Sequence, residues 1–200
     1  METTSNTTIP QAFSYAPSQR WDGNDGSWSS FIVRIGSPEA QSFRVFPSTT
    51  GQEVLVPLPE GCTAHDSSDC ESSRGAMPAF GTDGTGFLTN SSTTWDLLGI
   101  YTSDLEDTLG YEVNAQYGID DVGLQIDNSG GLNATNVVVG GIASKDFYLG
   151  VIGLGPKPSN FTTFNNPMPS LMGILNSTQK IPSLAYGYTA GASYSKSYIY

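Results

Sequence analysis

Basic residues are scarce in this chain. Its 200 residues include eight lysines and arginines against 19 aspartates and glutamates, so the net charge is −11. A nucleic-acid-binding protein needs clustered cations to displace the counterions of the phosphate backbone, and anionic membrane surfaces attract the same kind of cluster. The composition therefore argues against nucleic acid and against anionic membranes as partners.

Histidine and cysteine are rarer still. One histidine, His65, and two cysteines, Cys62 and Cys70, are too few for an ordinary zinc site, and we expect no metal or cofactor. The two cysteines bound the segment GCTAHDSSDC, which is rich in turn-forming residues. Such a short loop is compatible with a disulfide formed in an oxidising compartment.

Long hydrophobic runs are also absent, and none approaches the roughly 18 residues of a membrane-spanning helix. The first ten residues, METTSNTTIP, lack the basic and apolar regions of a signal peptide. Together with the cysteine pair, a set of N-x-Ser/Thr sequons nevertheless favours the secretory pathway, and hence an extracellular or cell-surface protein. These N-glycosylation candidates are Asn6, Asn90, Asn133, Asn160 and Asn176.

The residues that are present predict an all-β domain. Hydrophobic residues make up 38% of the chain, enough for a single core, and they occur in short runs separated by turn formers. A hairpin is predicted within 109–126, a helix at 170–176 with Ser170 as its N-cap, and another strand in the aromatic-rich 183–200. Strands are predicted near 31–35, 43–47, 53–57, 117–126, 136–143 and 147–152.

Several weak motifs follow one another in a specific order. They are IGSPEAQ (35–41), the cysteines at 62 and 70, GIDDV (118–122), FYLGVIGL (147–154) and the predicted helix. From about Tyr15 to Tyr188 the chain thereby resembles the N-terminal lobe of the pepsin-like aspartic proteases (peptidase A1), in a form similar to fungal members. The resemblance implies one domain at 15–200, behind a flexible segment 1–14. It also implies a closed or partly open barrel-like β fold with one or two short helices, and a Cys62–Cys70 disulfide.

The catalytic turn of that family is degenerate here. Family members place an aspartate in an Asp-Thr/Ser-Gly turn, but the corresponding segment FRVFPSTTGQEVLVP (43–57) contains Ser48, Thr49, Thr50 and Gly51. Alignment on LVP puts Ser48 at the aspartate position, and alignment on the glycine puts Thr49 there. No Asp-Thr-Gly or Asp-Ser-Gly triplet occurs in the sequence. Because aspartic proteolysis needs two carboxylates that share a proton, we assign no catalytic residue.

Other chemistries have weaker support. A nucleophilic Ser48 would need a base, yet His65 lies in the cysteine loop and the lysines adjoin polar or turn residues. The acidic segments 104–107 and Asp120–Asp121 lack calcium-loop spacing and are interpreted as solvated faces. In WDGNDGSW (21–28), the aspartates are interpreted as capping their own backbone, and the tryptophans as core or rim packing residues, with a platform that stacks on a sugar as the alternative. Glycines 153 and 155 are interpreted as close-packing glycines.

The resemblance implies a secreted or cell-surface pseudo-protease whose retained cleft binds a protein or peptide, as an inhibitory, binding or sensor module. Tyr111 and Tyr117 are the candidates for the flap tyrosine of the family. The alternatives are a protease lobe active only with a partner lobe, and a structural ectodomain of a membrane-anchored protein. Since the family's second lobe is not in this sequence, we expect the chain to bind a missing C-terminal lobe or to self-associate, through 183–200 and Phe46–Thr50.

Overall fold

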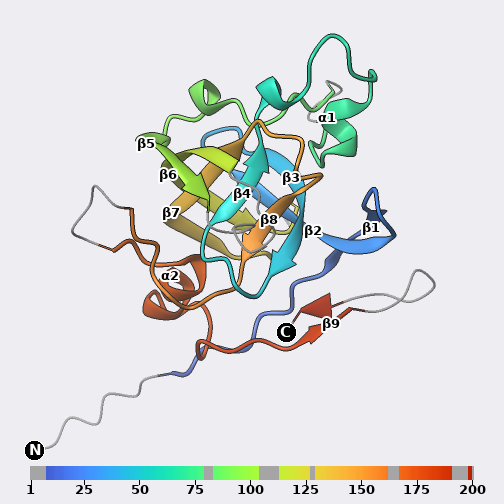
Figure 1. Ribbon diagram of the computed structural model, residues 1–200. Coiled ribbons are helices and arrows are strands. Elements are labelled where there is room, and N and C mark those ends of the chain that lie inside the picture. Colours follow the sequence, from blue (N-terminus) through green and yellow to red (C-terminus); the bar gives the residue numbers. More distant parts are fainter. Residues whose placement is uncertain are drawn as a thin grey trace, which may run out of the picture.

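The computed structural model describes residues 8–78, 83–103, 113–126, 129–161, 167–190 and 198–199 (Figure 1). An eight-stranded mixed sheet has the order β1-β2-β3-β8-β4-β7-β6-β5. Since β2 also pairs with β6, the strands from β2 to β6 in this order close into a ring, from which β1 and β5 extend. The strands are β1 (Pro17–Asp22), β2 (Trp28–Ile35), β3 (Gln41–Ser48), β4 (Val54–Pro57), β5 (Asp96–Ser103), β6 (Val113–Leu124), β7 (Asn133–Ile142) and β8 (Gly150–Gly153).

The remaining described elements are small. Helices α1 (Cys70–Ser73) and α2 (Leu171–Ser177) are accompanied by the 3-10 turns η1 (Pro59–Gly61) and η2 (Thr89–Ser91). Strands β9 (Tyr188–Thr189) and β10 (Tyr198–Ile199) form a separate antiparallel pair. The all-β prediction is confirmed. Within the described ranges, no helix has the length and apolar character needed to cross a lipid bilayer.

The strand predictions are confirmed where a local apolar run in the sequence supported them. Residues 137–142 of β7 are buried on both faces, as expected of their continuous apolar run, and β7 pairs in parallel with β4. The strand predicted at 147–152 begins only at Gly150. Before it, the Phe147 carbonyl accepts a hydrogen bond from the buried Arg74 side chain, at 3.2 Å.

The hairpin predicted within 109–126 is wrong over its described part. Residues 113–124 form one continuous strand, β6, which pairs with β5 along one edge and with β7 along the other. Gly118 does not turn the chain: a Cβ there would lie 2.5 Å from the Trp95 indole. The glycine therefore makes room for a tryptophan, and the hairpin is formed by β5 and β6 instead.

The core fills the ring of strands and continues under α2. Inward-facing Phe31, Val33, Ile35 and Val45 are fully buried. Helix α2 packs against β7 and buries four apolar residues, Leu171, Met172, Ile174 and Leu175. Its first turn is capped as predicted, because the Ser170 hydroxyl accepts a hydrogen bond from the Gly173 amide at 3.1 Å.

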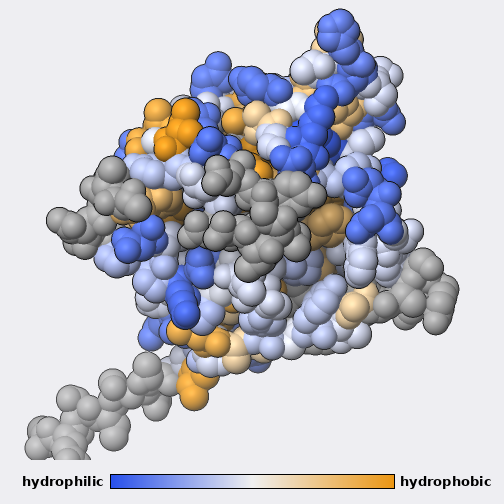
Figure 2. Space-filling model, in the orientation of Figure 1, coloured by the Kyte–Doolittle hydropathy of each residue, from blue (hydrophilic) through white to orange (hydrophobic). Residues whose placement is uncertain are grey.

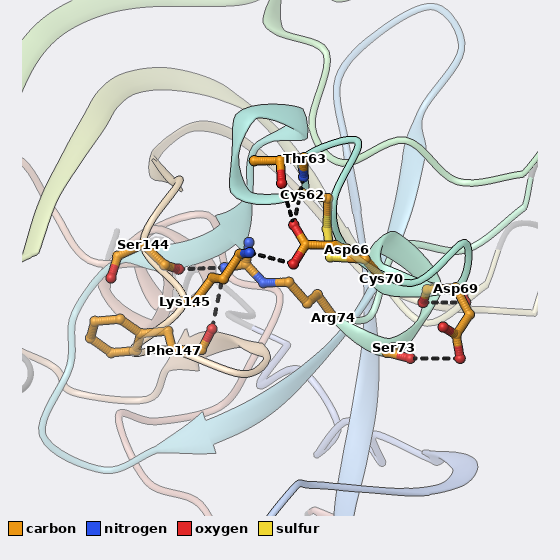
Figure 3. The surroundings of a disulfide bond; sticks show 11 residues. Cys62, Thr63, Asp66, Asp69, Cys70, Ser73, Arg74, Ser144, Lys145 and Phe147 are labelled. Atoms are coloured by element: carbon orange, nitrogen blue, oxygen red, sulfur yellow. Dashed lines mark hydrogen bonds and ion pairs between the residues drawn. A yellow bond between two sulfur atoms is a disulfide. The ribbon is translucent and has the colours of Figure 1, made fainter.

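The predicted disulfide is present, and an ion pair links the loop that it closes to the segment that leads into β8 (Figure 3). Cys62 and Cys70 are bonded, with their Cα atoms 5.9 Å apart. Inside the loop, the Asp66 carboxylate pairs with Lys145 at 2.5 Å and accepts bonds from Thr63. The Lys145 and Thr63 donors hold the pKa of Asp66 well below its usual range. The loop and residues 144–147 therefore form one surface.

Candidate functional site

The turn after β3 is fixed by hydrogen bonds on both sides. The Ser48 hydroxyl accepts a bond from the Gly51 amide at 3.0 Å and lies 3.4 Å from the Thr50 hydroxyl. Behind the turn, Leu154 donates to the Ser48 carbonyl and Gly155 to the Gly51 carbonyl, both at 2.8 Å. Ser48 is half-buried and Gly51 buried, while Thr49 and Thr50 are exposed. The turn thus presents hydroxyl groups in a defined geometry.

Glycines in and after β8 allow the backbone to lie directly against this turn. A Cβ at Gly153 would come within 2.7 Å of backbone atoms of Gly51, Gln52 and Glu53. A Cβ at Gly155 would lie 2.7 Å from the Gly51 carbonyl oxygen. The interpretation of both as close-packing glycines is confirmed. Any side chain at either position would displace the turn.

A groove of about 570 Å³ lies between the turn, the β5–β6 hairpin and the chain around Phe161. Three aromatic rings form its apolar wall: the Phe161 ring centroid lies 4.9 Å from that of Tyr101 and 5.1 Å from that of Tyr117. Hydroxyl and amide groups supply the polar part. The lining residues are Thr50, Gly51, Gln52, Glu53, Ile100, Tyr101, Thr102, Ser103, Asn114, Tyr117, Asn160 and Phe161.

The described lining of the groove contains few ionisable groups. Glu53 is the one carboxylate among its described lining residues, and neither lysine nor arginine is among them. His65 is exposed in the disulfide loop and does not line the groove. Nowhere in the described part of the chain do three or more His, Cys, Asp or Glu side chains gather as metal ligands would.

The flap candidates and the sequons occupy different surroundings. Tyr117 lies in β6 with its side chain 3% exposed in the wall of the groove, whereas Tyr111 lies outside the described residues. Asn90, Asn133 and Asn160 are exposed and Asn176 is half-buried, while Asn6 is outside the described ranges. Asn160 lines the groove, which no feature of the sequence indicated, because residues 50, 101, 117 and 161 meet only in the folded chain.

The interpretation of Asp120–Asp121 as a solvated face is wrong for Asp120, whereas Asp121 is half-buried. Asp120 is 1% exposed, and its carboxylate accepts bonds from the Ser92 hydroxyl at 3.0 Å, the Thr94 hydroxyl and the Asp121 amide. Residues 92–94 cover this part of β6 and supply donors to Oδ1, whereas Oδ2 is buried without a hydrogen-bond partner among the described residues. Burial, assisted by the Asp120 charge, raises the pKa of Asp121. The segment 104–107 lies outside the described residues.

The turn aspartate Asp22 also has a different role from the one predicted. Its carboxylate pairs with the Arg44 guanidinium, with Nε–O distances of 3.0 and 3.1 Å, and accepts a bond from the Ser30 hydroxyl. Both side chains of the ion pair are nearly buried, at 11% and 12% exposure. Asp22 therefore links β1 to β2 and β3 instead of capping its own turn.

Comparisons with known proteins do not place the chain: no protein-family model matches it, and no curated protein does either. What the site does must therefore be argued from its geometry and from the sequence motifs.

Proposed function

We propose that the chain is a pepsin-like lobe without proteolytic activity, which binds an extended peptide or protein segment in the groove over the Ser48 turn. The observation that carries this proposal is the turn itself. Ser48 Oγ accepts a hydrogen bond from the Gly51 amide, and Ser48 is one of the two positions, with Thr49, where the resemblance expects the catalytic carboxylate; a groove of about 570 Å³ lies beside this turn. Secretion or display at the cell surface is part of the proposal and is supported by the disulfide and the sequons.

The loss of activity follows from the ionisation of the groups present. An aliphatic hydroxyl does not ionise in the working range of an acid protease, so Ser48 cannot act as the base that activates water. Glu53, the one carboxylate among the described lining residues, cannot replace two carboxylates that share one proton. The described lining therefore offers groups for recognition and lacks the carboxylate pair that aspartic proteolysis needs.

A peptide is the occupant because an edge strand lines the groove. β5 ends the sheet order and, among the described strands, pairs only with β6. Ile100 to Ser103 of this strand contribute to the groove. An edge strand can offer backbone amides and carbonyls to an extended peptide, while alternate side chains enter neighbouring pockets. Apolar surface lies over β5 in Figure 2, where Leu97 is 54% and Ile100 71% exposed.

We expect the purified chain to bind peptides selected from a random heptapeptide display library and to cleave none of them. Ile100→Asp should raise the Kd of the selected peptides by about tenfold, since it places a charge in the apolar part of the groove. Isothermal titration calorimetry measures the change. Ile126→Asp is the matched control, because Ile126 is 51% exposed and does not line the groove; it should leave the Kd unchanged.

Activity is tested separately with denatured casein at pH values from about 3 to 7. Neither the wild-type chain nor Ser48→Asp should cleave it, because the variant still lacks the second carboxylate. Pepstatin-sensitive cleavage by the unmodified chain would contradict the pseudo-protease proposal. Equal peptide affinities in the Ile100→Asp and Ile126→Asp variants would instead contradict the assignment of the binding site.

A second surface is proposed to bind another domain. An apolar pocket of about 310 Å³ lies between α2, the residues before β1 and residues 181–187. Beside it, Leu184 is 48% and Tyr186 37% exposed. Apolar surface of this kind marks an interface, and the occupant proposed is a pepsin-like C-terminal lobe or, in its absence, a second copy of this chain.

We therefore expect the isolated chain to dimerise as its concentration rises, and Leu184→Lys to shift the dimer towards monomer by placing a charge on the apolar surface. Size-exclusion chromatography with light scattering over a concentration series measures the mass. Leu88→Lys, at a site 38% exposed and outside this pocket, is the control. A monomeric mass at every concentration would contradict self-association.

A further inference from the structure

A second groove, of about 470 Å³, lies between the β1–β2 turn, the end of β3 and residues 146–149. Trp28, the first residue of β2, lines it and is 58% exposed. Trp28 is therefore not a core residue, and of the two packing positions expected for it, core or rim, its exposure fits only the rim. A large aromatic side chain left open to solvent at a concave site requires a different explanation.

The indole of Trp28 is held in place by its own turn. Its Nε1–H donates to the Asp25 carboxylate at 3.0 Å. Gly23 has a φ of +134°, and a Cβ there would lie 2.8 Å from Cδ1 of the indole; a Cβ at Gly26 would lie 3.5 Å from Nε1. The segment DGNDGSW thus fixes an exposed ring through two close glycines and one carboxylate. A ring fixed in advance loses little conformational entropy when a ligand stacks on it.

The rest of the groove combines apolar walls with acceptors. Tyr188, 43% exposed, and the half-buried Tyr148 add aromatic surface. Phe46 and Pro47 of β3 add further apolar surface. Asn24, Asp25 and Asp146 are the exposed polar residues of the lining. The described lining contains no lysine or arginine. Burial raises the pKa of Tyr188, so its hydroxyl remains protonated.

We propose that this groove binds a neutral saccharide, with one pyranose ring stacked on Trp28 and its hydroxyls donating to Asp25, Asp146 and Asn24. A pyranose presents an apolar C–H face and a rim of hydroxyl donors, which matches a fixed indole flanked by carboxylates and an amide. Two carboxylates without a cation disfavour phosphates and acidic sugars. An apolar protein surface would fit less well, because it would bury these acceptors without partners.

Cellotetraose, laminaritetraose, mannotetraose and chitotetraose are the probes. We expect at least one of them to bind saturably in the millimolar range or tighter, measured by calorimetry, and to shift the Trp28 indole N–H resonance in NMR spectra. Trp28→Ala should raise that Kd by about tenfold or more, and Trp28→Phe should raise it less because a smaller aromatic face remains. Asp146→Asn should also weaken binding, and it leaves the β1–β2 turn unchanged because Asp146 lies outside that turn.

Leu97→Ala is the matched control: Leu97 is 54% exposed and lies outside the groove, so this variant should bind like the wild type. The Ile100→Asp variant should also keep its saccharide affinity, which separates this site from the peptide groove. Circular dichroism establishes whether each variant is folded. If Trp28→Ala does not fold, the two single variants Trp28→Phe and Asp146→Asn test the proposal. Three results would overturn the proposal: no binding of any probe in the millimolar range, binding that persists unchanged without Trp28, or Trp28-dependent dimerisation without saccharide binding.

Discussion

Alanine at position 153 is expected to destabilise the protein by about 3 kcal/mol and to abolish peptide binding. The added methyl group would lie 2.7 Å from backbone atoms of three turn residues, Gly51, Gln52 and Glu53. Backbone cannot move aside as a flexible side chain can, so either β8 or the turn must shift. Because the turn forms one side of the groove, stability and binding should be lost together. Urea unfolding and peptide titration measure the two effects.

Gly173→Ala is the control for this substitution. A Cβ at position 173 would lie 3.4 Å from the Ser170 hydroxyl and 3.7 Å from Pro169, which are ordinary contacts. Since Gly173 lies inside α2, alanine should stabilise the protein by up to about 1 kcal/mol through its helix propensity. Equal unfolding midpoints for Gly153→Ala and Gly173→Ala would show that the close backbone approach at Gly153 does not affect stability.

Tyr117→Ala is expected to cost about 3–5 kcal/mol and to remove one wall of the groove. Tyr117 is 3% exposed, and its ring packs against Phe161 at 5.1 Å and Tyr101 at 6.3 Å between centroids. Loss of this ring leaves a cavity in the smaller hydrophobic cluster, which also contains Leu55, Val138 and Ile142. Chemical unfolding measures the stability, and titration below the unfolding transition measures the peptide affinity.

Tyr117→Phe separates the ring from the hydroxyl. It keeps the packing, so its stability should fall by no more than about 1.5 kcal/mol. If peptide affinity is also preserved, the ring alone forms the binding surface; if affinity falls at unchanged stability, the hydroxyl contacts the peptide. A Tyr117→Ala variant as stable as Tyr117→Phe would contradict the packing role assigned to this residue.

Local patterns in the sequence were enough for the class of fold and for several elements. The apolar run 137–142 predicted a strand buried on both faces, and Ser170 before a helically spaced apolar set predicted the capped start of α2. These predictions succeeded because a strand or helix buries the side of its own sequence that is apolar. The absence of a carboxylate at Ser48 to Gly51 likewise depends only on residue identity.

Other features depend on which segments meet. A hairpin was expected within 109–126, but Gly118 in that segment lies against Trp95, and Asp120 was expected in solvent but accepts bonds from Ser92 and Thr94. The same residue types would suit either environment. Whether a glycine turns the chain or admits a neighbour, and whether a carboxylate is buried, is decided by the partner that the fold supplies.

The two grooves separate most clearly what the sequence determined from what only the tertiary structure decided. The sequence by itself determined an acidic, all-β chain with a hydroxyl turn and a tryptophan beside a glycine-rich turn. Only the tertiary structure decided that Tyr101, Tyr117 and Phe161 form one wall beside that turn, and that Trp28 is held open to solvent. Periodicity reports which side of a segment is apolar. It cannot report which distant segments pack together, because that is set by the closure of the β2–β6 ring and the burial it imposes on the whole chain.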